Sequence, residues 1–193
     1  IVRLWMLRLI LKELSYNKIM QEYKVKVHDD GAKYWYRKGE FHRLDGPAVE
    51  YGDGDRYWYR KGKLHREDGP AVEYISGTKR WYQNDKLHRE DGPAIEYADG
   101  DKEWYQNGKC HRLEGPAIEW VNDRKTWYQN GERHHLDGPA VEYANGKKSW
   151  YVKGKELTEE EFNNRKTVEV TLEDIAKAMN IDVDKLRIKG TQI

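Results

Sequence analysis

The chain has 193 residues, of which 37% are apolar and 36% are charged, so it lacks the apolar side chains that a large globular core requires. The net charge of +1 argues against nucleic acid or an anionic membrane as a partner, because both attract concentrated basic surfaces. One cysteine, Cys110, excludes an internal disulfide framework, and no run of residues reaches the ~18 to 20 apolar positions that cross a bilayer. The abundance of aromatics, with 8 Trp and 14 Tyr against 2 Phe, favours half-buried β surfaces.

The first segment, residues 1–22, is apolar but is interrupted by Arg3, Arg8 and Lys12. Because its apolar stretch is broken and no small-residue cleavage site follows, we do not expect a secretory signal. Two interpretations stay open. The segment is a helix lying on the rest of the protein, or residues 1–19 are an upstream extension of the reading frame, with Met20 as the natural start.

A repeat of 23 residues occupies positions 23–157. The phrase HRLDGPA begins at His42 and returns, with small changes, at intervals of 23 residues, and a Trp-Tyr pair keeps the same interval. A catalytic site needs its residues once, whereas a phrase repeated at a constant interval is typical of a structural unit. The sequence therefore divides into a half-unit at 23–41 and full units at 42–64, 65–87, 88–110, 111–133 and 134–156.

Each unit is predicted to be a short β meander in which AVEY and RYWYR are strands joined by GDGD, and KG turns the chain into KLHR. Asp-Gly and Asn-Gly indicate type I′ hairpin turns, which need positive φ at both central residues. Asp85 and Asp123 replace turn glycines, and Asp tolerates the left-handed region better than most residues do. We expect Gly46 to supply an unusual backbone angle, and Pro47 to begin the next strand where no ladder donor is needed.

If both turns contain two residues, Val49 faces Trp58 and Trp58 faces His65. Val or Ile, Trp and His then share one face of the sheet, and Ala, Tyr and Leu share the other. We expect a mainly β fold, an elongated antiparallel β-hairpin repeat array with a small C-terminal α/β or helical appendage. The predicted core that joins the units consists of the indoles, with the histidines as internal fasteners: Trp35, Trp58, Trp81, Trp104, Trp127, Trp150, His42, His65, His88, His111 and His134.

Each repeated histidine has an acidic residue three positions later, as Asp45 follows His42. A histidine oriented by a carboxylate is an acid–base element, but five copies without a matching Ser or Cys nucleophile favour a structural hydrogen bond within each unit. Three strands per unit would place equivalent histidines about 14 Å apart, too far to share a metal ion. The sequence therefore predicts no catalytic residue, no metal, no cofactor and no enzymatic activity.

The tyrosine after each tryptophan and the arginine after each histidine form the candidate recognition face. A row of glutamates that includes Glu73 balances the arginine charge, and Arg–Glu pairing is the alternative use of these arginines. An exposed tryptophan ladder would instead suit stacking of sugar rings or bases. The candidate binding residues are Tyr59, Tyr82, Tyr105, Tyr128, Arg66, Arg89 and Arg112.

The C-terminal part, residues 158–193, differs from the repeats. Thr158 and Glu161 have the spacing of a capping box, which predicts a short helix that closes the array with Phe162 packed on its last edge. Residues 166–190 have the pattern strand, helix, turn, helix, strand. The stretch TLEDIAKAMNIDVDKL resembles a helix-turn-helix and, in its Thr-Leu and Ile-Ala, a LysM glycan-binding module. We interpret 158–193 as a capping helix and a small helix-turn-helix-like module.

The repeated phrase carries a family resemblance. WYQNDKLHREDGPAIEYADG at 81–100 resembles the MORN repeat family, and the HRxDGPA form resembles variant repeats of bacteriophage and large DNA virus proteins. The resemblance implies a β-hairpin array used for scaffolding and interaction. We therefore expect a non-catalytic scaffold, encoded by a phage or mobile element, that binds a protein such as a host factor. The alternative is a glycan- or cell-wall-binding module. A cytoplasmic location is expected, the host cytoplasm for a phage protein, with the virion as the other location.

Overall fold

The computed structural model describes residues 23–165 and 177–178. The N-terminal extension at 1–22 and nearly all of the predicted C-terminal module lie outside the described residues. The chain divides into two compact units after Glu156, one residue before the boundary predicted from the sequence. The fold of the described residues is mainly β, as the repeats predict.

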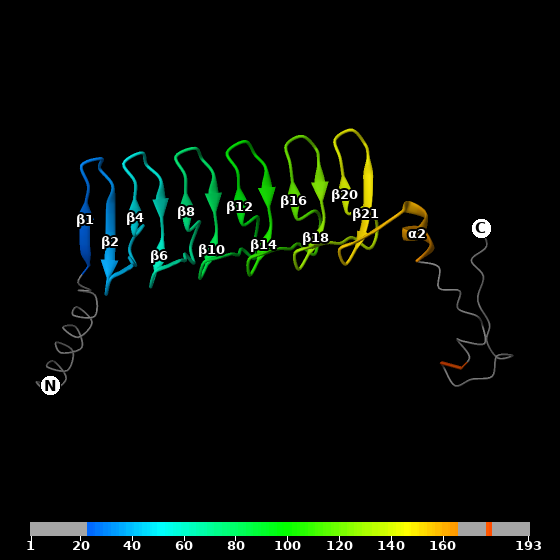
Figure 1. Cartoon of the computed structure of the whole chain (residues 1–193), viewed down its shortest axis with the longest axis horizontal. Coiled ribbons are helices and arrows are strands. Elements are labelled where there is room, and N and C mark those ends of the chain that lie inside the picture. The colour runs from blue at the N-terminus through cyan, green and yellow to red at the C-terminus, as the bar shows by residue number, and fades with distance from the viewer. Residues whose placement is uncertain (1–22, 166–176, 179–193) are drawn as a thin grey trace, which may run out of the picture. The chain divides into compact units, whose positions relative to one another are not determined.

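The repeat array is built on one antiparallel sheet of 14 strands, in which successive hairpins stand side by side (Figure 1). Two strands of each full unit pair with each other and with the neighbouring units. The strands of this sheet are β1 (Lys24–Val27), β2 (Lys33–Arg37), β3 (Glu40–Phe41), β4 (Val49–Glu50), β5 (Arg56–Tyr57), β8 (Val72–Glu73), β9 (Lys79–Arg80), β12 (Ile95–Glu96), β13 (Lys102–Glu103), β16 (Ile118–Glu119), β17 (Lys125–Thr126), β20 (Val141–Glu142), β21 (Lys148–Val152) and β22 (Lys155–Leu157).

Four units carry, in addition, a two-stranded hairpin of their own, which lies along the lower edge of the array (Figure 1). Because a unit adds two strands to the main sheet rather than three, equivalent residues of neighbouring units lie about 10 Å apart, and the expectation of 14 Å was wrong. The separate hairpins pair β6 (Tyr59–Arg60) with β7 (Lys63–Leu64), β10 (Tyr82–Gln83) with β11 (Lys86–Leu87), β14 (Tyr105–Gln106) with β15 (Lys109–Cys110), and β18 (Tyr128–Gln129) with β19 (Glu132–Arg133).

The turn of each separate hairpin is of the predicted type. Lys61 and Gly62 both have positive φ, of 51° and 72°, and the turn pairs Tyr59 with Leu64 as expected. Asp85 takes the glycine position of the next unit at φ 65°, which confirms that aspartate adopts the left-handed conformation there. These turns fix the local register of the lower hairpins.

The turn of the main-sheet hairpins differs from the prediction. The Tyr51 N–H donates to the Asp55 carbonyl at 2.9 Å, so the loop contains three residues and ends in Gly54 with φ 108°. The Asp53 carboxylate accepts from the Asp55 N–H at 3.1 Å and stabilises the longer loop. The extra residue pairs Val49 with Tyr57, so the predicted facing of Val49 and Trp58 was wrong by one position.

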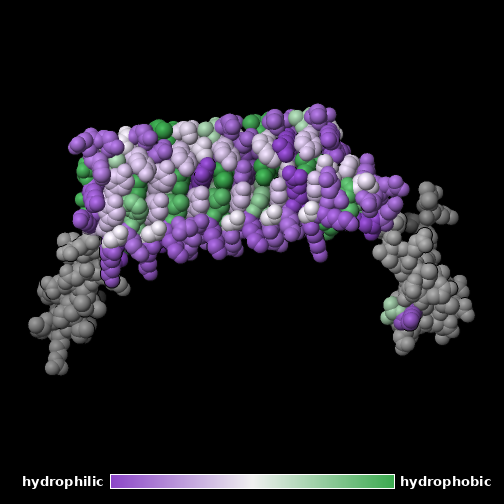
Figure 2. Space-filling model, viewed as in Figure 1, coloured by the Kyte–Doolittle hydropathy of each residue, from purple (hydrophilic) through white to green (hydrophobic). Residues whose placement is uncertain are grey.

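The tightest packing in the array is made by small side chains rather than by the indoles. A column of alanines is completely buried, and Val49, Val72, Ile95 and Val141 are at most 5% exposed. The repeated tryptophans are only half-buried, so the prediction that they form the core was wrong. On the face drawn in Figure 2, apolar side chains form separate stripes between more hydrophilic regions. The buried alanines are Ala32, Ala48, Ala71, Ala94, Ala117 and Ala140.

Backbone hydrogen bonds explain this distribution. The Trp58 N–H donates to the Ala71 carbonyl of the next unit at 2.8 Å, and the Ala48 N–H donates to the Tyr57 carbonyl at 2.9 Å. Ala71 and Ala48 are therefore hydrogen-bonded within the ladder. Trp58 itself lies between β5 and β6, where the chain passes from the main sheet to the lower hairpin, and its ring stays at the surface.

The compact unit that begins after Glu156 contains the predicted short helix, α2 (Glu159–Asn164). Thr158 is its N-cap: its hydroxyl accepts from the Glu161 N–H at 3.1 Å, and the Glu161 carboxylate accepts from the Thr158 N–H at 2.8 Å. The capping box is therefore confirmed. Phe162 is 2% exposed, with the Arg165 guanidinium 4.0 Å from its ring centroid. That Phe162 closes the array stays a prediction.

Candidate functional site

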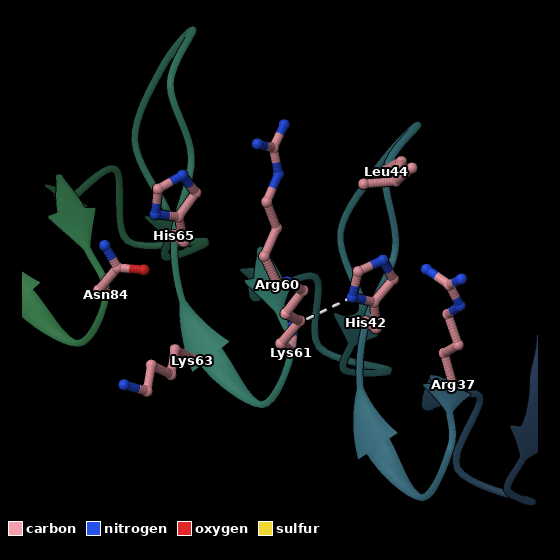
Figure 3. A pocket seen from close by; sticks show the side chains of 8 residues that line it. All are labelled: Arg37, His42, Leu44, Arg60, Lys61, Lys63, His65 and Asn84. Atoms are coloured by element: carbon pink, nitrogen blue, oxygen red, sulfur yellow. Dashed lines mark hydrogen bonds between the residues drawn. The ribbon is translucent and has the colours of Figure 1, made fainter.

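Three of the repeated histidines each link the start of a unit to the last turn of the same unit. His42 Nδ1 accepts a hydrogen bond from the Lys61 N–H at 3.0 Å (Figure 3), and His88 and His111 accept in the same way from Asn107 and Asn130 at 3.1 Å. For these rings the hydrogen bond lies within the unit, as predicted, and its donor is a backbone amide of that turn. A ring that accepts at Nδ1 carries its proton on Nε2 when neutral, so one tautomer is favoured.

His42 is 4% exposed, and burial lowers the pKa of its imidazole below the ordinary 6.5. The nearby cations Arg37 and Arg60 lower that pKa further, and Glu40 opposes them. The imidazole is therefore neutral at pH 7 and is engaged at Nδ1, as a structural hydrogen-bond acceptor requires.

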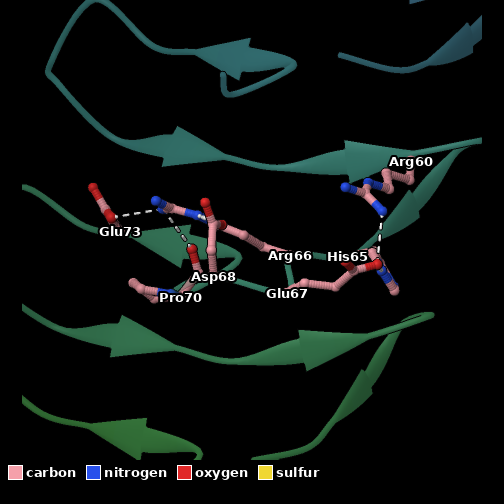
Figure 4. A network of polar contacts seen from close by, with 7 residues as sticks. All are labelled: Arg60, His65, Arg66, Glu67, Asp68, Pro70 and Glu73. Atoms are coloured by element: carbon pink, nitrogen blue, oxygen red, sulfur yellow. Dashed lines mark hydrogen bonds and ion pairs between the residues drawn. The ribbon is translucent and has the colours of Figure 1, made fainter. Parts of the chain in front are cut away.

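The arginine after each histidine covers the tryptophan. The Arg66 guanidinium lies 4.1 Å from the centroid of the Trp58 ring. Its Nε donates to Asp68 at 2.9 Å, and its Nη1 donates to the Pro70 carbonyl at 3.1 Å and to Glu73 at 3.0 Å (Figure 4). These charge-assisted bonds lower the pKa of the Asp68 carboxyl. One guanidinium thus joins the loop, the strand and the indole of adjacent units.

The same network recurs along the array. Of the two uses considered for these arginines, recognition and pairing with the glutamate row, the structure contains the Arg–Glu pairing. The Arg–Glu ion pairs are 2.7 to 3.3 Å long, and each of these guanidiniums lies 3.9 to 4.2 Å from a Trp ring centroid. In the fifth unit His135 replaces the arginine, stacks on Trp127 with 4.9 Å between ring centroids, and keeps the contact with the Pro139 carbonyl at 2.9 Å. The four Arg–Glu pairs are Arg43–Glu50, Arg66–Glu73, Arg89–Glu96 and Arg112–Glu119.

The glycine of the repeated Gly-Pro serves this network. A Cβ atom on Gly92 would lie 2.9 Å from Arg89 Cζ, which is closer than real Cβ contacts. Gly46 does not have positive φ, so the expectation of an unusual backbone angle there was wrong. Of the five Gly-Pro glycines only Gly115 has positive φ, of 95°. The position requires glycine mainly because the guanidinium lies against it.

The candidate tyrosines are half-buried in the lower hairpins. The Tyr59 ring lies 5.3 Å from Phe41, and burial raises the pKa of the Tyr59 hydroxyl. The Tyr105 hydroxyl donates to Glu103 at 2.9 Å, and the Tyr128 hydroxyl accepts from Arg133 at 3.3 Å. These contacts give the tyrosines roles in packing, and the structure does not bring them together with the arginines around one site.

The arginines instead line a series of surface grooves. One groove, of about 540 Å³, lies between residues 43–47 and residues 65–68, with Trp58 in its wall. The next groove, of about 630 Å³, repeats this arrangement around Trp81, between residues 66–69 and 88–91. Arg66 lines both grooves and Arg89 lines the second, whereas no tyrosine lines either one.

Sequence reasoning missed the lip position, the one that follows residue two of each HRxDGP loop, at which Leu44, Glu67 and Glu90 line the two grooves. Leu44 is 53% exposed there, Leu113 is 73% exposed and Leu136 is 47% exposed. Glu67 and Glu90 take the same position in the other two units, with side chains 66% and 85% exposed. The signal was available, because this position changes between repeats whose neighbouring residues do not.

No family model matches the chain, and no curated protein shows significant similarity to it. Within residues 23–165 and 177–178, no helix is long and apolar enough to span a membrane. In the same part of the chain, no three His, Cys, Asp or Glu side chains come together as a metal would need. The row of grooves, with an exposed residue that varies between units beside the arginine, is the candidate functional site.

Proposed function

We propose that this protein is a non-catalytic repeat scaffold that binds a protein partner along the row of grooves between its HRxDGP loops. The observation that carries the proposal is a division of labour within the repeat. The side chains that recur in every unit are used in holding the array, and the exposed side chain at the groove lip differs from unit to unit.

The polar groups of the repeat support a structural rather than a catalytic role. The His42 imidazole is neutral and bonded to the last turn of its unit, and the Arg66 guanidinium is bonded to Asp68, Pro70 and Glu73. A catalytic pair would need one of these groups free to contact a reacting atom. The resemblance of the phrase to MORN-like repeats supports the same proposal, and with it an origin in a phage or mobile element.

The lip supports protein binding. Leu113 and Leu136 are large apolar side chains, 73% and 47% exposed, in consecutive units about 10 Å apart along the array. A polyproline II segment rises about 3.1 Å per residue and has three residues per turn, so every third side chain would point toward the array at about the spacing of the units. Many shallow contacts of this kind add up to affinity through multivalency.

The test compares the native chain with L113E/L136E, which gives two grooves the glutamate that units 65–87 and 88–110 already have. Because Glu67 and Glu90 fit the same loop, the variant is expected to keep the native circular dichroism spectrum and melting temperature. Each protein is immobilised and exposed to a lysate of the cell in which it is made, and bound proteins are identified by mass spectrometry. The proposal expects a partner retained by the native chain and lost by the variant. Retention of the same proteins by both chains would refute it.

A second candidate rests on one observation: Trp58 and Trp81, which are only partly buried, line successive grooves. Aromatic faces at a regular spacing suit a polysaccharide whose sugar rings stack on them. Titration of the chain with soluble cell-wall oligosaccharides, monitored by tryptophan fluorescence, separates the two candidates, because a protein-binding groove gives no saturable change.

A further inference from the structure

A pocket separate from the grooves lies among the turns of the first units. Its volume is about 480 Å³, and Arg37, Arg60, Lys61 and Lys63 are among the residues that line it (Figure 3). None of its described lining residues is acidic. Two acidic residues outside this lining oppose the charge: Glu67, 66% exposed, pairs with Arg60 at 2.8 Å, and Glu40 raises the pKa of His42 against the effect of the cations. The pocket therefore has an excess of positive charge.

The ring of His42 adds a buried donor to this pocket. Its Nδ1 accepts from the Lys61 N–H, so Nε2 carries a proton, and Nε2 has no hydrogen-bond partner among the described residues. Arg37 and Arg60 lie on either side of the ring (Figure 3). A buried N–H without an acceptor is costly. Two guanidiniums beside such a donor form a site suited to an oxyanion.

The two arginines occur only in the first units. The positions of Arg37 and Arg60 are occupied by Gln83, Gln106 and Gln129 in the following units. Lys61 is replaced by Asn84, Asn107 and Asn130 in the next three turns, and a lysine, Lys153, returns in the last turn. His88 and His111 keep the same hydrogen bond to the last turn of their units without any of these cations, so the array needs the histidine and does not need the arginines. The cations are therefore not explained by the packing of the repeat.

We propose that this pocket binds a carboxylate of an acidic segment of the partner protein. The inference rests on the proposed function, because the segment belongs to the same partner. Arg–carboxylate pairing is the interaction that this array already uses in four of its five loops, as in Arg66–Glu73. Leu44 also lines the pocket and is 53% exposed, which provides an apolar contact for a peptide side chain that a bare anion lacks.

The test measures binding of a fluorescent hexaglutamate peptide to the full chain by anisotropy, with a hexaglutamine peptide of the same length beside it. The variant R37Q/R60Q introduces the residue that later units contain at this position. The control K86Q/K109Q removes the same number of charges from the position that Lys63 occupies in its unit. We expect R37Q/R60Q to weaken hexaglutamate binding at least tenfold and K86Q/K109Q to leave it within a factor of two.

Three results would refute carboxylate binding at the pocket: an equal loss of hexaglutamate binding in both variants, equal binding of hexaglutamine, or displacement of the peptide by inorganic phosphate at equimolar concentration. Binding of the native chain to phosphatidylserine vesicles that R37Q/R60Q abolishes would assign the pocket to a membrane instead. The proposed function is tested separately. Partner capture that persists without hexaglutamate binding refutes the pocket alone, and hexaglutamate binding without a captured partner refutes the scaffold role alone.

Discussion

Replacement of Gly92 by alanine tests whether the stacked guanidinium holds the units together. The new Cβ would lie 2.9 Å from Arg89 Cζ, so the guanidinium must move. It now lies 4.0 Å from the Trp81 ring centroid and donates to the Pro93 carbonyl at 3.1 Å and to Glu96 at 2.8 Å. All three contacts require the present position of the guanidinium, from which the methyl group would displace it.

The expected cost follows from these contacts. The cation–π contact is worth about 0.5 to 1 kcal/mol at a partly exposed site, and a hydrogen bond from a charged donor about 1.5 to 3 kcal/mol. The ion pair with the half-exposed Glu96 adds less than about 1 kcal/mol. Because the side chain is flexible and recovers part of this, and because Gly→Ala stabilises by about 0.4 to 1 kcal/mol through the unfolded chain, we expect a net loss of about 1 to 2 kcal/mol.

Urea unfolding of G92A, R89A and R89A/G92A, followed by far-ultraviolet circular dichroism, measures the coupling between the two residues. Removal of the guanidinium removes the clash, so G92A is expected to be neutral or stabilising in the R89A background. G138A is a matched control, since its Cβ would lie 3.3 Å from His135 Cε1 and costs less. If G92A destabilises equally with and without Arg89, the guanidinium is not the reason for the glycine. Equal denaturant slopes are required for the comparison, because repeat arrays can unfold in parts.

Three further predictions concern single residues. H135R gives the fifth loop the guanidinium that the other four contain, and we expect its urea midpoint to rise by the equivalent of about 0.5 to 1 kcal/mol; a fall would contradict the network. Burial raises the pKa of the Cys110 thiol to about 12, so a thiol reagent at pH 8 should label the native chain far more slowly than the chain in urea. The pKa of His42 is lowered in the folded state, so the unfolded chain binds its proton more readily and stability should fall as the pH drops below about 6.5. H42Q should reduce that fall, and an unchanged pH profile in H42Q would refute the assignment.

Local signals in the sequence were sufficient for the parts of the fold that are decided within a few residues. The type I′ turn at Lys61-Gly62 and the capping box at Thr158 each depend on neighbours closer than four positions. For the same reason Asp85 was recognised in a glycine position, because its left-handed conformation is set by the turn itself.

The predictions that failed concern interactions for which the sequence is compatible with more than one register or partner. The stretch Gly52-Asp53-Gly54 fits a loop of two or three residues, and the Asp53 carboxylate decides for three by bonding to Asp55. The one additional loop residue shifts the pairing of the two strands by one position, and it so changes which side chains share a face of the sheet. The partner of His42 is the backbone N–H of Lys61, 19 positions away, and because every residue other than proline offers such an N–H, no residue type in the sequence indicated it.

The misplaced tryptophans have the same origin and explain how the array can be stable with so little apolar content. With the shifted register, Ala71 and Val72 rather than Trp58 occupy the interior of the sheet. Arg66 covers the Trp58 ring from the surface side. The guanidinium makes hydrogen bonds to its own loop while its face packs on the indole. The cover is therefore polar on the side that faces solvent and closely packed on the side that faces the ring. Because this cover is complete within one pair of neighbouring units, the stability of the array is a sum of local terms. A residue that takes no part in the cover, such as the one at each groove lip, is then free to differ between units, and substitutions there change what the surface binds without changing how the array holds together.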